Sequence, residues 1–390
     1  MTDSTDRGPE ETGSGNGATG PAGGQADGGA RPPARRRVTL TGISSRAWEH
    51  PADRGALVAL RELKGFDEIL RKFFGLFNER YFRMKYLGSS IRANGWQYSR
   101  VHAIYLEAAA ALDFGEPADL PELYITQTPF ANAGAFGMDK PFLVVNSATV
   151  QMMDDDELRF VLGHELGHIR SGHAVYHTLL IWLIELMRGL NWIPLGALAL
   201  RGIVAAMMEW YRKAELSCDR AGLLASQDPA AALRVHMKFA GGGDLSDIDT
   251  AAFLDQANEY DRANGDFRDS LIKLMLLEAS THPMPVARAA ELRRWVEVGE
   301  YRRILSGDYP RREDDATASV SEEVKAAAKS YRDAFARSQD PLAGLLRRFG
   351  DGANVAGEWA KAGADKFRAW VAGDARRDEE PGGDVPDDDR

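Results

Sequence analysis

Apolar side chains recur at helical spacing over most of the chain, with polar and charged residues between them. This spacing predicts amphipathic helices over 53–82, 94–112, 174–188, 196–226, 229–240, 248–263 and 284–299. Two short and continuously apolar segments, 123–126 and 142–145, predict strands instead. We therefore expect an α+β fold that is mainly α, with one small β-sheet.

A further helix is expected after the two strands. Four acidic residues, Asp154–Glu157, precede the apolar run Leu158–Leu162. Acidic side chains in a first turn interact favourably with the positive end of the helix dipole, and Asp154 or Asp155 is the expected N-cap. The sequence thus predicts where this helix begins.

This helix carries the pentapeptide His164-Glu165-Leu166-Gly167-His168. Residues four apart on a helix project from the same face, so the two imidazoles can bind one zinc ion. Glu165 then lies beside the open coordination position, where its carboxylate can accept a proton from zinc-bound water. The same residues also arise by chance on ordinary helices. We interpret them as the centre of a metal-dependent hydrolase, most often a peptidase.

A catalytic zinc usually has a third protein ligand. His173 is near, but it lies five residues after His168 and misses the spacing that places a third histidine six residues on. His173 and His177 are therefore expected to be helix-end or surface residues. Glu215 is the better candidate, with Asp219 on the same helix face to hold a ligand imidazole by its second nitrogen. Taken alone, this Glu–Asp pair also fits a solvated helix face.

These motifs resemble those of the HtpX and CAAX-prenyl-endopeptidase family of zinc metallopeptidases, in the gluzincin class. That family pairs a zinc helix, H-E-x-x-H, with E-x-x-x-D on a second helix. The resemblance implies that His164, His168 and Glu215 bind one zinc ion per chain, that Glu165 is the general base and that Asp219 orients a ligand. It also implies a gluzincin-type zinc-peptidase domain with the small sheet beside the active-site helix.

Two further segments extend the resemblance, which covers about residues 50 to 300. Asn132, Ala133 and Gly134 lie between the predicted strands, where the family has an Asn-Ala segment next to the substrate cleft. An exposed strand edge there would pair with an extended peptide. Downstream, the segment Thr281-His282-Pro283 implies that His282 donates a hydrogen bond to the oxyanion of the reaction. A turn histidine ordered by flanking prolines is the alternative for His282.

Small residues mark two further features. Gly163 and Gly167 each cost about 1 kcal/mol in helix propensity relative to Ala, so we expect a close backbone approach there, to a strand or to the substrate. Cys218 is the single cysteine, which excludes an internal disulfide and is compatible with the cytoplasm. We expect it to be a small buried residue; the alternative is a redox or metal-sensing thiol.

The ends of the chain differ in composition from its centre. The first 37 residues are rich in Gly, Pro, Ala and acidic residues and show no secretory signal, so a cytoplasmic location is expected. The expected organisation is a disordered tail over 1–37, a zinc metallopeptidase domain over 38–305, a linker over 306–320, a C-terminal helical segment over 321–375 and an acidic disordered tail over 376–390. The net charge of −10 argues against a nucleic-acid partner.

An apolar helical hairpin, about 178–210, is expected between the two zinc motifs. Its hydrophobicity suggests membrane contact, but Glu185 and Arg188 lie within it, and each charge costs about 2.5–3.5 kcal/mol at a bilayer centre. We therefore expect no spanning helix. A buried hairpin that gates the active site and a hairpin that makes peripheral contact with a membrane both stay open.

The function that these features favour is a zinc-dependent endopeptidase acting on proteins or peptides. Glu165 would accept a proton from the zinc-bound water and pass it to the leaving amine. Two other classes stay open: a zinc protein that binds polypeptides as a scaffold or chaperone, and a latent protease in which a loop histidine or the hairpin fills the open zinc position. The presence of Glu165 argues against the scaffold or chaperone, because a protein that only binds polypeptides does not need a general base.

Overall fold

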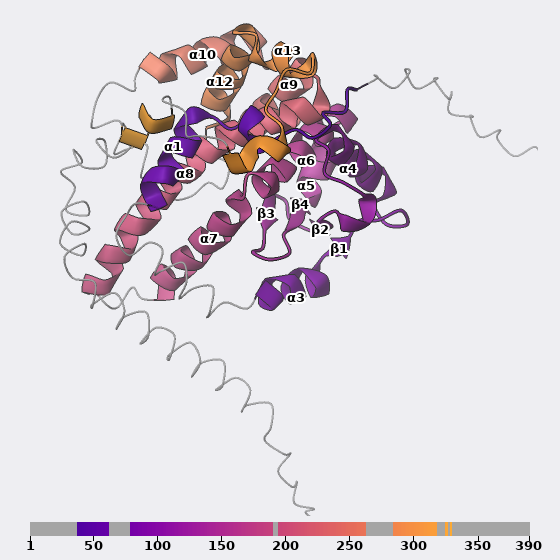
Figure 1. The fold of residues 1–390 in the computed structure, drawn as a ribbon. Helices are drawn as coiled ribbons and strands as arrows, with labels where there is room; N and C mark the ends of the chain where they lie inside the picture. Colours follow the sequence, from indigo (N-terminus) through magenta and orange to yellow (C-terminus); the bar gives the residue numbers. More distant parts are fainter. Residues whose placement is uncertain are drawn as a thin grey trace, which may run out of the picture. The chain divides into compact units, whose positions relative to one another are not determined.

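Helices make up most of the structure, which is a computed structural model and is shown in Figure 1. It describes residues 37–61, 79–189, 194–262, 284–317, 324–326 and 328–329. The predicted tails except Arg37, the C-terminal helical segment beyond 329 and His282 lie outside the described residues. The elements are η1 (Ser45–Ala47), α1 (Pro51–Arg61), α3 (Glu79–Ser89), β1 (Ile91–Arg92), α4 (Ser99–Ala111), η2 (Pro117–Asp119), β2 (Glu122–Thr126), β3 (Ala133–Phe136), β4 (Phe142–Asn146), α5 (Ser147–Met152), α6 (Asp155–Arg170), α7 (His173–Gly189), α8 (Pro194–Ser226), α9 (Pro229–Gly241), α10 (Thr250–Arg262), α12 (Pro285–Glu297), α13 (Glu300–Leu305) and η4 (Arg312–Thr317).

The small sheet has four strands in the order β1-β2-β4-β3. Both predicted strands are present as β2 and β4, and they pair in parallel, with Glu122 opposite Phe142. The segment between them also forms a strand, because β3 pairs antiparallel with β4. β3 therefore ends the sheet on one side, where it packs against α6 and α7. The α+β, mainly α fold is confirmed, with the sheet beside α6.

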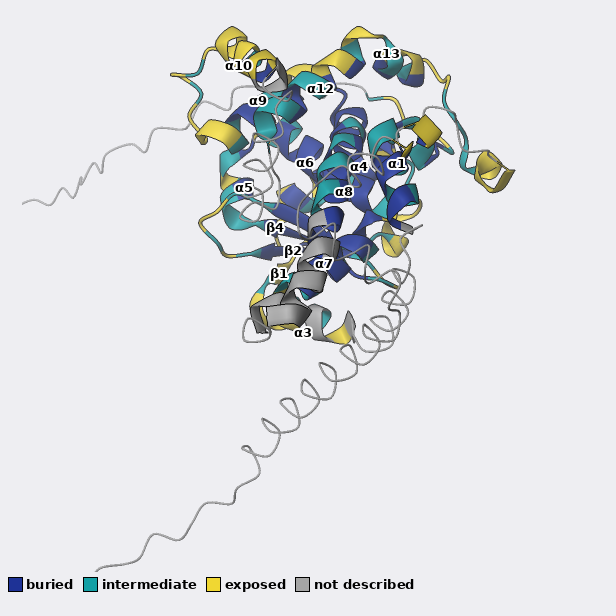
Figure 2. Ribbon diagram, turned by 90° about the vertical axis from the view of Figure 1, so that its left-hand side faces the viewer, coloured by how far each residue is buried: buried dark blue, intermediate teal, exposed yellow. Residues whose placement is uncertain are grey.

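The helix α6 begins at the N-cap that the acidic cluster predicts. Asp154 Oδ1 accepts hydrogen bonds from the backbone N–H groups of Asp156 and Glu157, at 2.9 and 2.8 Å. In return Glu157 Oε2 accepts from the Asp154 N–H at 2.9 Å, which completes a capping box. From Glu157 to His168 the helix is buried on every side (Figure 2). Such a helix is held rigidly by its neighbours, which suits a site that must keep its geometry.

The glycines of α6 mark its crossing with α8. A Cβ on Gly163 would lie 2.3 Å from the Cβ of Ala225, and a Cβ on Gly167 would lie 2.7 Å from that of Ala221. A Cβ on Gly222 of α8 would lie 2.7 Å from the carbonyl oxygen of Phe160. The expected close approach is therefore present, but its partner is a second helix rather than a strand or the substrate. Two backbones can approach this closely only where side chains are absent, and this crossing brings the His pair opposite the second predicted motif.

Replacing Gly163 with Ala tests this crossing. The added methyl group meets Ala225 well inside van der Waals contact, so overpacking should lower the free energy of unfolding by about 1–3 kcal/mol, more than the helix propensity gained. Urea unfolding of the variant measures this loss. Gly88→Ala in α3 is the matched control, because a Cβ there meets nothing within 4 Å. Equal stability of the two variants would contradict the crossing, and Ala225→Gly should rescue Gly163→Ala.

The predicted hairpin is formed by α7 and by the first half of α8. Side chains of α1, α7 and α8 share a hydrophobic cluster whose largest buried members include Leu183, Met207 and Trp210. The part of the hairpin near the site is thus held in a protein core. Among the described residues, no helix has the length and hydrophobicity needed to cross a membrane. One unbroken helix, α8, leads from the hairpin to Glu215 and Asp219.

The predicted linker is described up to Thr317, and it contacts the start of the domain. The Ser44 N–H donates to the carbonyl of Pro310 at 3.0 Å, and the Ser44 hydroxyl donates to Asp315 at 2.6 Å. Arg312 donates to the carbonyl of Asp113 at 2.9 Å. This part of the predicted linker is therefore packed on the domain.

Candidate metal centre

Three side chains from two crossing helices converge at one buried point. Helix α6 contributes His164 and His168, and α8 contributes Glu215. The two Nε2 atoms lie 3.2 Å apart, and Glu215 oxygens lie 3.5 Å from His164 Nε2 and 3.2 Å from His168 Nε2. All three side chains are buried, and their ligand atoms lie within 4.8 Å of one another. The structure thus brings together the three residues that the sequence suggested as ligands.

This donor set suits zinc. Two imidazole nitrogens and one carboxylate oxygen are the ligands of many catalytic zinc sites, which leave a fourth position for water or substrate. Burial lowers the pKa of His168 to about 3, so this ring is neutral and ready to bind a cation. At His164 burial also disfavours charge, but Glu215 and Asp219 outweigh it and raise the pKa to about 9. A metal ion at His164 Nε2 would replace that proton.

Asp219 holds the far side of His164. Its Oδ1 lies 3.0 Å from His164 Nδ1, which leaves Nε2 directed at the convergence point. Arg288 of α12 pairs with both oxygens of Asp219, at 2.7 and 2.5 Å, and its third nitrogen lies 2.8 Å from Glu215 Oε2. Burial opposes ionisation of Asp219, but Arg288 outweighs it and holds the pKa of this carboxyl well below its usual range. The carboxylate therefore stays charged.

Glu165 and Tyr211 lie beside the converging ligands. Glu165 follows His164 on α6 and is 1% exposed. Tyr211, one turn before Glu215 on α8, stacks on the His168 ring at 5.6 Å between centroids. Burial raises the pKa of Tyr211 well above its usual value, and the carboxylates of Glu215 and Glu165 raise it further. Tyr211 was not predicted as a site residue, although its spacing of four residues from Glu215 places both on one helix face.

His173 lies at a helix end, one of its two expected positions, but it is buried and not on the surface. It begins α7, and its Nε2 lies 3.1 Å from the buried Asp53, which also accepts hydrogen bonds from Trp210 and Ser217. Its Nδ1 lies 3.5 Å from the Cys218 sulfur. His173 is buried because Asp53, its ion-pair partner, lies on α1. The spacing of residues around the zinc motif does not predict this contact. Cys218 is fully buried, as expected.

The predicted substrate segment lies at the edge of the sheet. Ala133 and Gly134 are buried in β3, opposite Val145 and Val144 of β4. Asn132, just before the strand, exchanges backbone hydrogen bonds with the Thr149 hydroxyl at 2.7 and 2.8 Å. The carbonyl of Ala135 lies 3.2 Å from Nδ1 of His177, which is buried on α7 and not on the surface. The segment is thus adjacent to α6, which carries the His pair, and to α7.

Comparisons with known proteins agree with one another. The profile of Peptidase family M48 matches residues 95–296. A relative from Arabidopsis thaliana, "Plastoglobule-localized metallopeptidase 48, chloroplastic", is 34% identical over 265 residues, which are 66% of this chain and 74% of the relative. A "Protease HtpX homolog" from Helicobacter pylori is 38% identical over 76 residues, or 18% of this chain and 23% of the relative.

A second "Protease HtpX homolog", from Tropheryma whipplei, is 27% identical over 148 residues, or 31% of this chain and 51% of the relative. The chain therefore spans about half or less of the HtpX relatives that it matches. No solved structure matches it. All these similarities concern metallopeptidases or proteases by name, which agrees with the motifs on α6 and α8.

Proposed function

The chain belongs to peptidase family M48, the HtpX-type metallopeptidases, and we propose that it is a zinc-dependent endopeptidase with Glu165 as its general base. The observation that carries the proposal is the convergence of His164, His168 and Glu215 within 4.8 Å at a buried point. Glu165 is the next residue of the same helix, and its buried carboxylate acts electrostatically on Tyr211, the residue that stacks on the His168 ring. Family membership and local geometry support the same chemistry independently.

The residues have distinct tasks in this proposal. His164, His168 and Glu215 would hold the zinc, which supplies polarisation of the substrate carbonyl and acidifies a water molecule. Glu165 accepts a proton from the attacking water and delivers it to the amine nitrogen of the scissile bond. Asp219 keeps His164 in the tautomer with its hydrogen on Nδ1, and Arg288 keeps Asp219 charged. Tyr211 restricts the His168 ring by stacking.

The edge strand β3 is the proposed docking line for an extended peptide. It packs against α6, which carries the His pair, and it ends the sheet among the described strands. A substrate strand added there would place its peptide bonds alongside the active-site helix. Ala133 and Gly134 would contribute backbone hydrogen bonds, which select for an extended main chain more than for particular side chains. Asn132, whose backbone is bonded to the Thr149 hydroxyl, would fix the start of the strand beside the substrate. His282 stays a proposed oxyanion donor.

Cleavage of a broad peptide library tests the proposed activity. The protein is stripped of metal with a chelator, assayed, then reloaded with zinc and assayed again. We expect cleavage only in the zinc-loaded sample, at internal peptide bonds. Mass spectrometry of the products gives the cleaved bonds and the sequence preference. Full cleavage by the metal-free protein would overturn the proposal, because the hydrolysis would then not depend on zinc.

Replacing Asp219 with Asn tests the support of His164. The variant keeps the side-chain volume but loses the charge that orients the imidazole, so the zinc dissociation constant should rise about 10–100-fold. Competition with a fluorescent zinc chelator measures this change. Asp255→Asn on the exposed side of α10 is the control and should leave zinc affinity unchanged. Unchanged affinity in both variants would remove Asp219 from the metal-binding machinery.

A further inference from the structure

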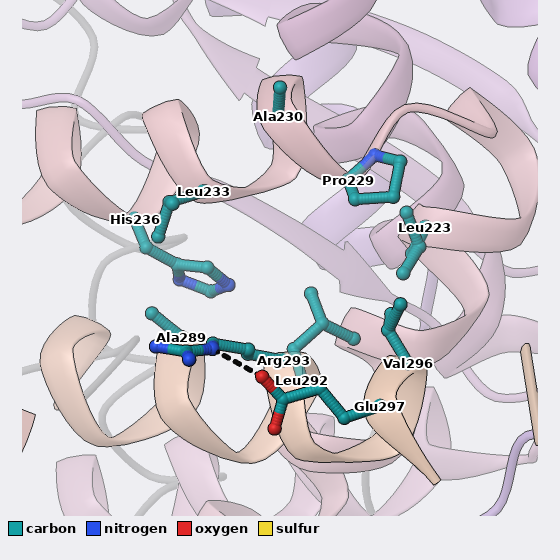
Figure 3. A pocket seen from close by; sticks show the side chains of 10 residues that line it. All are labelled: Leu223, Pro229, Ala230, Leu233, His236, Ala289, Leu292, Arg293, Val296 and Glu297. Atoms are coloured by element: carbon teal, nitrogen blue, oxygen red, sulfur yellow. Dashed lines mark hydrogen bonds and ion pairs between the residues drawn. The ribbon is translucent and has the colours of Figure 1, made fainter. Parts of the chain in front are cut away.

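A cavity of about 340 Å³ lies between α9 and α12, next to the end of α8 (Figure 3). Its walls are mainly apolar, from Leu223, Leu233, Ala289, Leu292 and Val296. At its rim Arg293 pairs with Glu297 at 2.6 Å, so the charged residues there neutralise each other. Its volume lies within the range of small-molecule sites in proteins. None of the proposed metal ligands lines it.

One polar side chain points into this cavity. Figure 3 shows the imidazole of His236 directed from α9 into the space above α12. His236 is 1% exposed, and among the described residues neither of its ring nitrogens has a hydrogen-bond partner. Buried polar groups in native proteins are nearly always hydrogen-bonded, and leaving one unpaired costs free energy. A hydrogen-bonding group is therefore expected in the cavity beside this ring.

The charges around His236 define what that group can be. Its Nε2 lies 3.7 Å from Asp219 Oδ2, and Asp219 in turn is paired with Arg288. Burial lowers the pKa of His236 to about 4, so the ring is neutral at physiological pH and can donate at one nitrogen and accept at the other. Neither Asp219 nor Arg288 lines the cavity, and the two charged residues at its rim, Arg293 and Glu297, pair with each other. A carboxylate or an ammonium would therefore lose its hydration without gaining a free counter-ion among the described lining residues, whereas an uncharged hydroxyl group can hydrogen-bond to the neutral ring.

We propose that this cavity is a binding site for an uncharged, mainly hydrocarbon molecule whose hydroxyl group hydrogen-bonds to His236. The apolar walls take the hydrocarbon part and the imidazole takes the single polar group. This division of one polar contact and a large apolar surface is typical of sites for small amphiphiles. The site is separate from the proposed metal centre and does not depend on it, although Asp219 lies between them.

Straight-chain alcohols serve as the probe, because their chain length and head group can be changed separately. Titration calorimetry of the full-length protein should show binding of 1-hexanol, with an affinity on the order of tenfold above that of 1-butanol, since each buried methylene adds about fourfold. Hexanoate should bind about tenfold or more weakly than 1-hexanol, because its charge would be buried among apolar walls without a free counter-ion. Both metal-free and zinc-loaded protein are titrated, so loss of zinc cannot mimic failure of the cavity.

Three variants test the named residues. His236→Phe removes the hydrogen-bonding partner and should weaken 1-hexanol binding about fivefold, whereas His236→Gln retains a donor and an acceptor and should lose less. Leu233→Trp fills the cavity from a half-buried position of α9 whose side chain points into it in Figure 3, and should abolish binding. Thermal unfolding confirms that each variant is folded.

The outcomes separate the possibilities. Binding of 1-hexanol that Leu233→Trp abolishes and His236→Phe weakens supports the site and its polar contact. No binding of any alcohol would overturn the proposal and leave water as the partner of His236. Equal binding of 1-hexanol and hexanoate, or unchanged binding in His236→Phe, would overturn the assigned head group.

Discussion

Glu165→Gln is expected to lower kcat/KM for peptide hydrolysis by about 10²–10⁴-fold while the protein still binds zinc. The amide has almost the same shape as the carboxylate but cannot accept a proton from the attacking water. Because His164, His168 and Glu215 are untouched, the zinc content should equal that of the parent. Steady-state cleavage of one library-derived peptide, together with zinc analysis of the same sample, measures both quantities.

The control for Glu165→Gln is Glu300→Gln on α13, where the side chain is 44% exposed and pairs only with its own helix neighbours among the described contacts. That variant should retain full activity and full zinc content. Hydrolysis by Glu165→Gln at the parental rate would exclude Glu165 as the general base. Loss of zinc together with activity would instead indicate that Glu165 supports the metal site.

Glu215→Ala is expected to lose zinc and activity together. Its carboxylate oxygens lie 3.2 and 3.5 Å from the two imidazole Nε2 atoms, so removing it takes away the one proposed anionic ligand. Loss of a direct ligand should weaken zinc binding by more than the ~100-fold that loss of a supporting group costs. Zinc competition titration measures the affinity, and reloading with excess zinc should restore little activity.

Glu209→Ala is the matched control, because Glu209 lies on the same helix, α8, but at its surface, paired with Lys213. It should bind zinc as the parent does. Removing Glu215 also deprives the buried Arg288 of one partner and costs stability, so Glu215→Gln is measured in parallel. A folded Glu215→Gln protein with parental zinc affinity would show that this residue is not a ligand.

Local features of the site followed directly from the sequence. The N-cap at Asp154 and the shared face of His164 and His168 depend only on residues within two helical turns, and the structure has both. The helices around them and the strands β2 and β4 were predicted for the same reason. The roles of Glu215 and Asp219 were predicted from the resemblance to a family, because their own spacing fits a solvated helix face equally well.

The packing around the site could not be predicted in this way. Gly163 and Gly167 signalled a close approach, but nothing near them in the chain shows that the partner is α8. His173 was expected at a helix end or at the surface, and its burial could not be predicted because its ion-pair partner, Asp53, comes from α1, more than a hundred residues earlier. The segment after residue 305 looked like a linker because its contacts with Ser44 and Asp113 are equally remote in sequence.

The sequence by itself determined which residue types are available and which of them share a helix face, because caps and periodicity act between near neighbours. Only the tertiary structure decided which faces meet. Arg288 and Asp219 contact His164 although they lie 124 and 55 residues from it in the sequence. Their arrangement therefore depends on the crossing of α6, α8 and α12. Burial at that crossing also sets the charges, since a low-dielectric interior keeps a carboxylate ionised only where a partner such as Arg288 is held beside it.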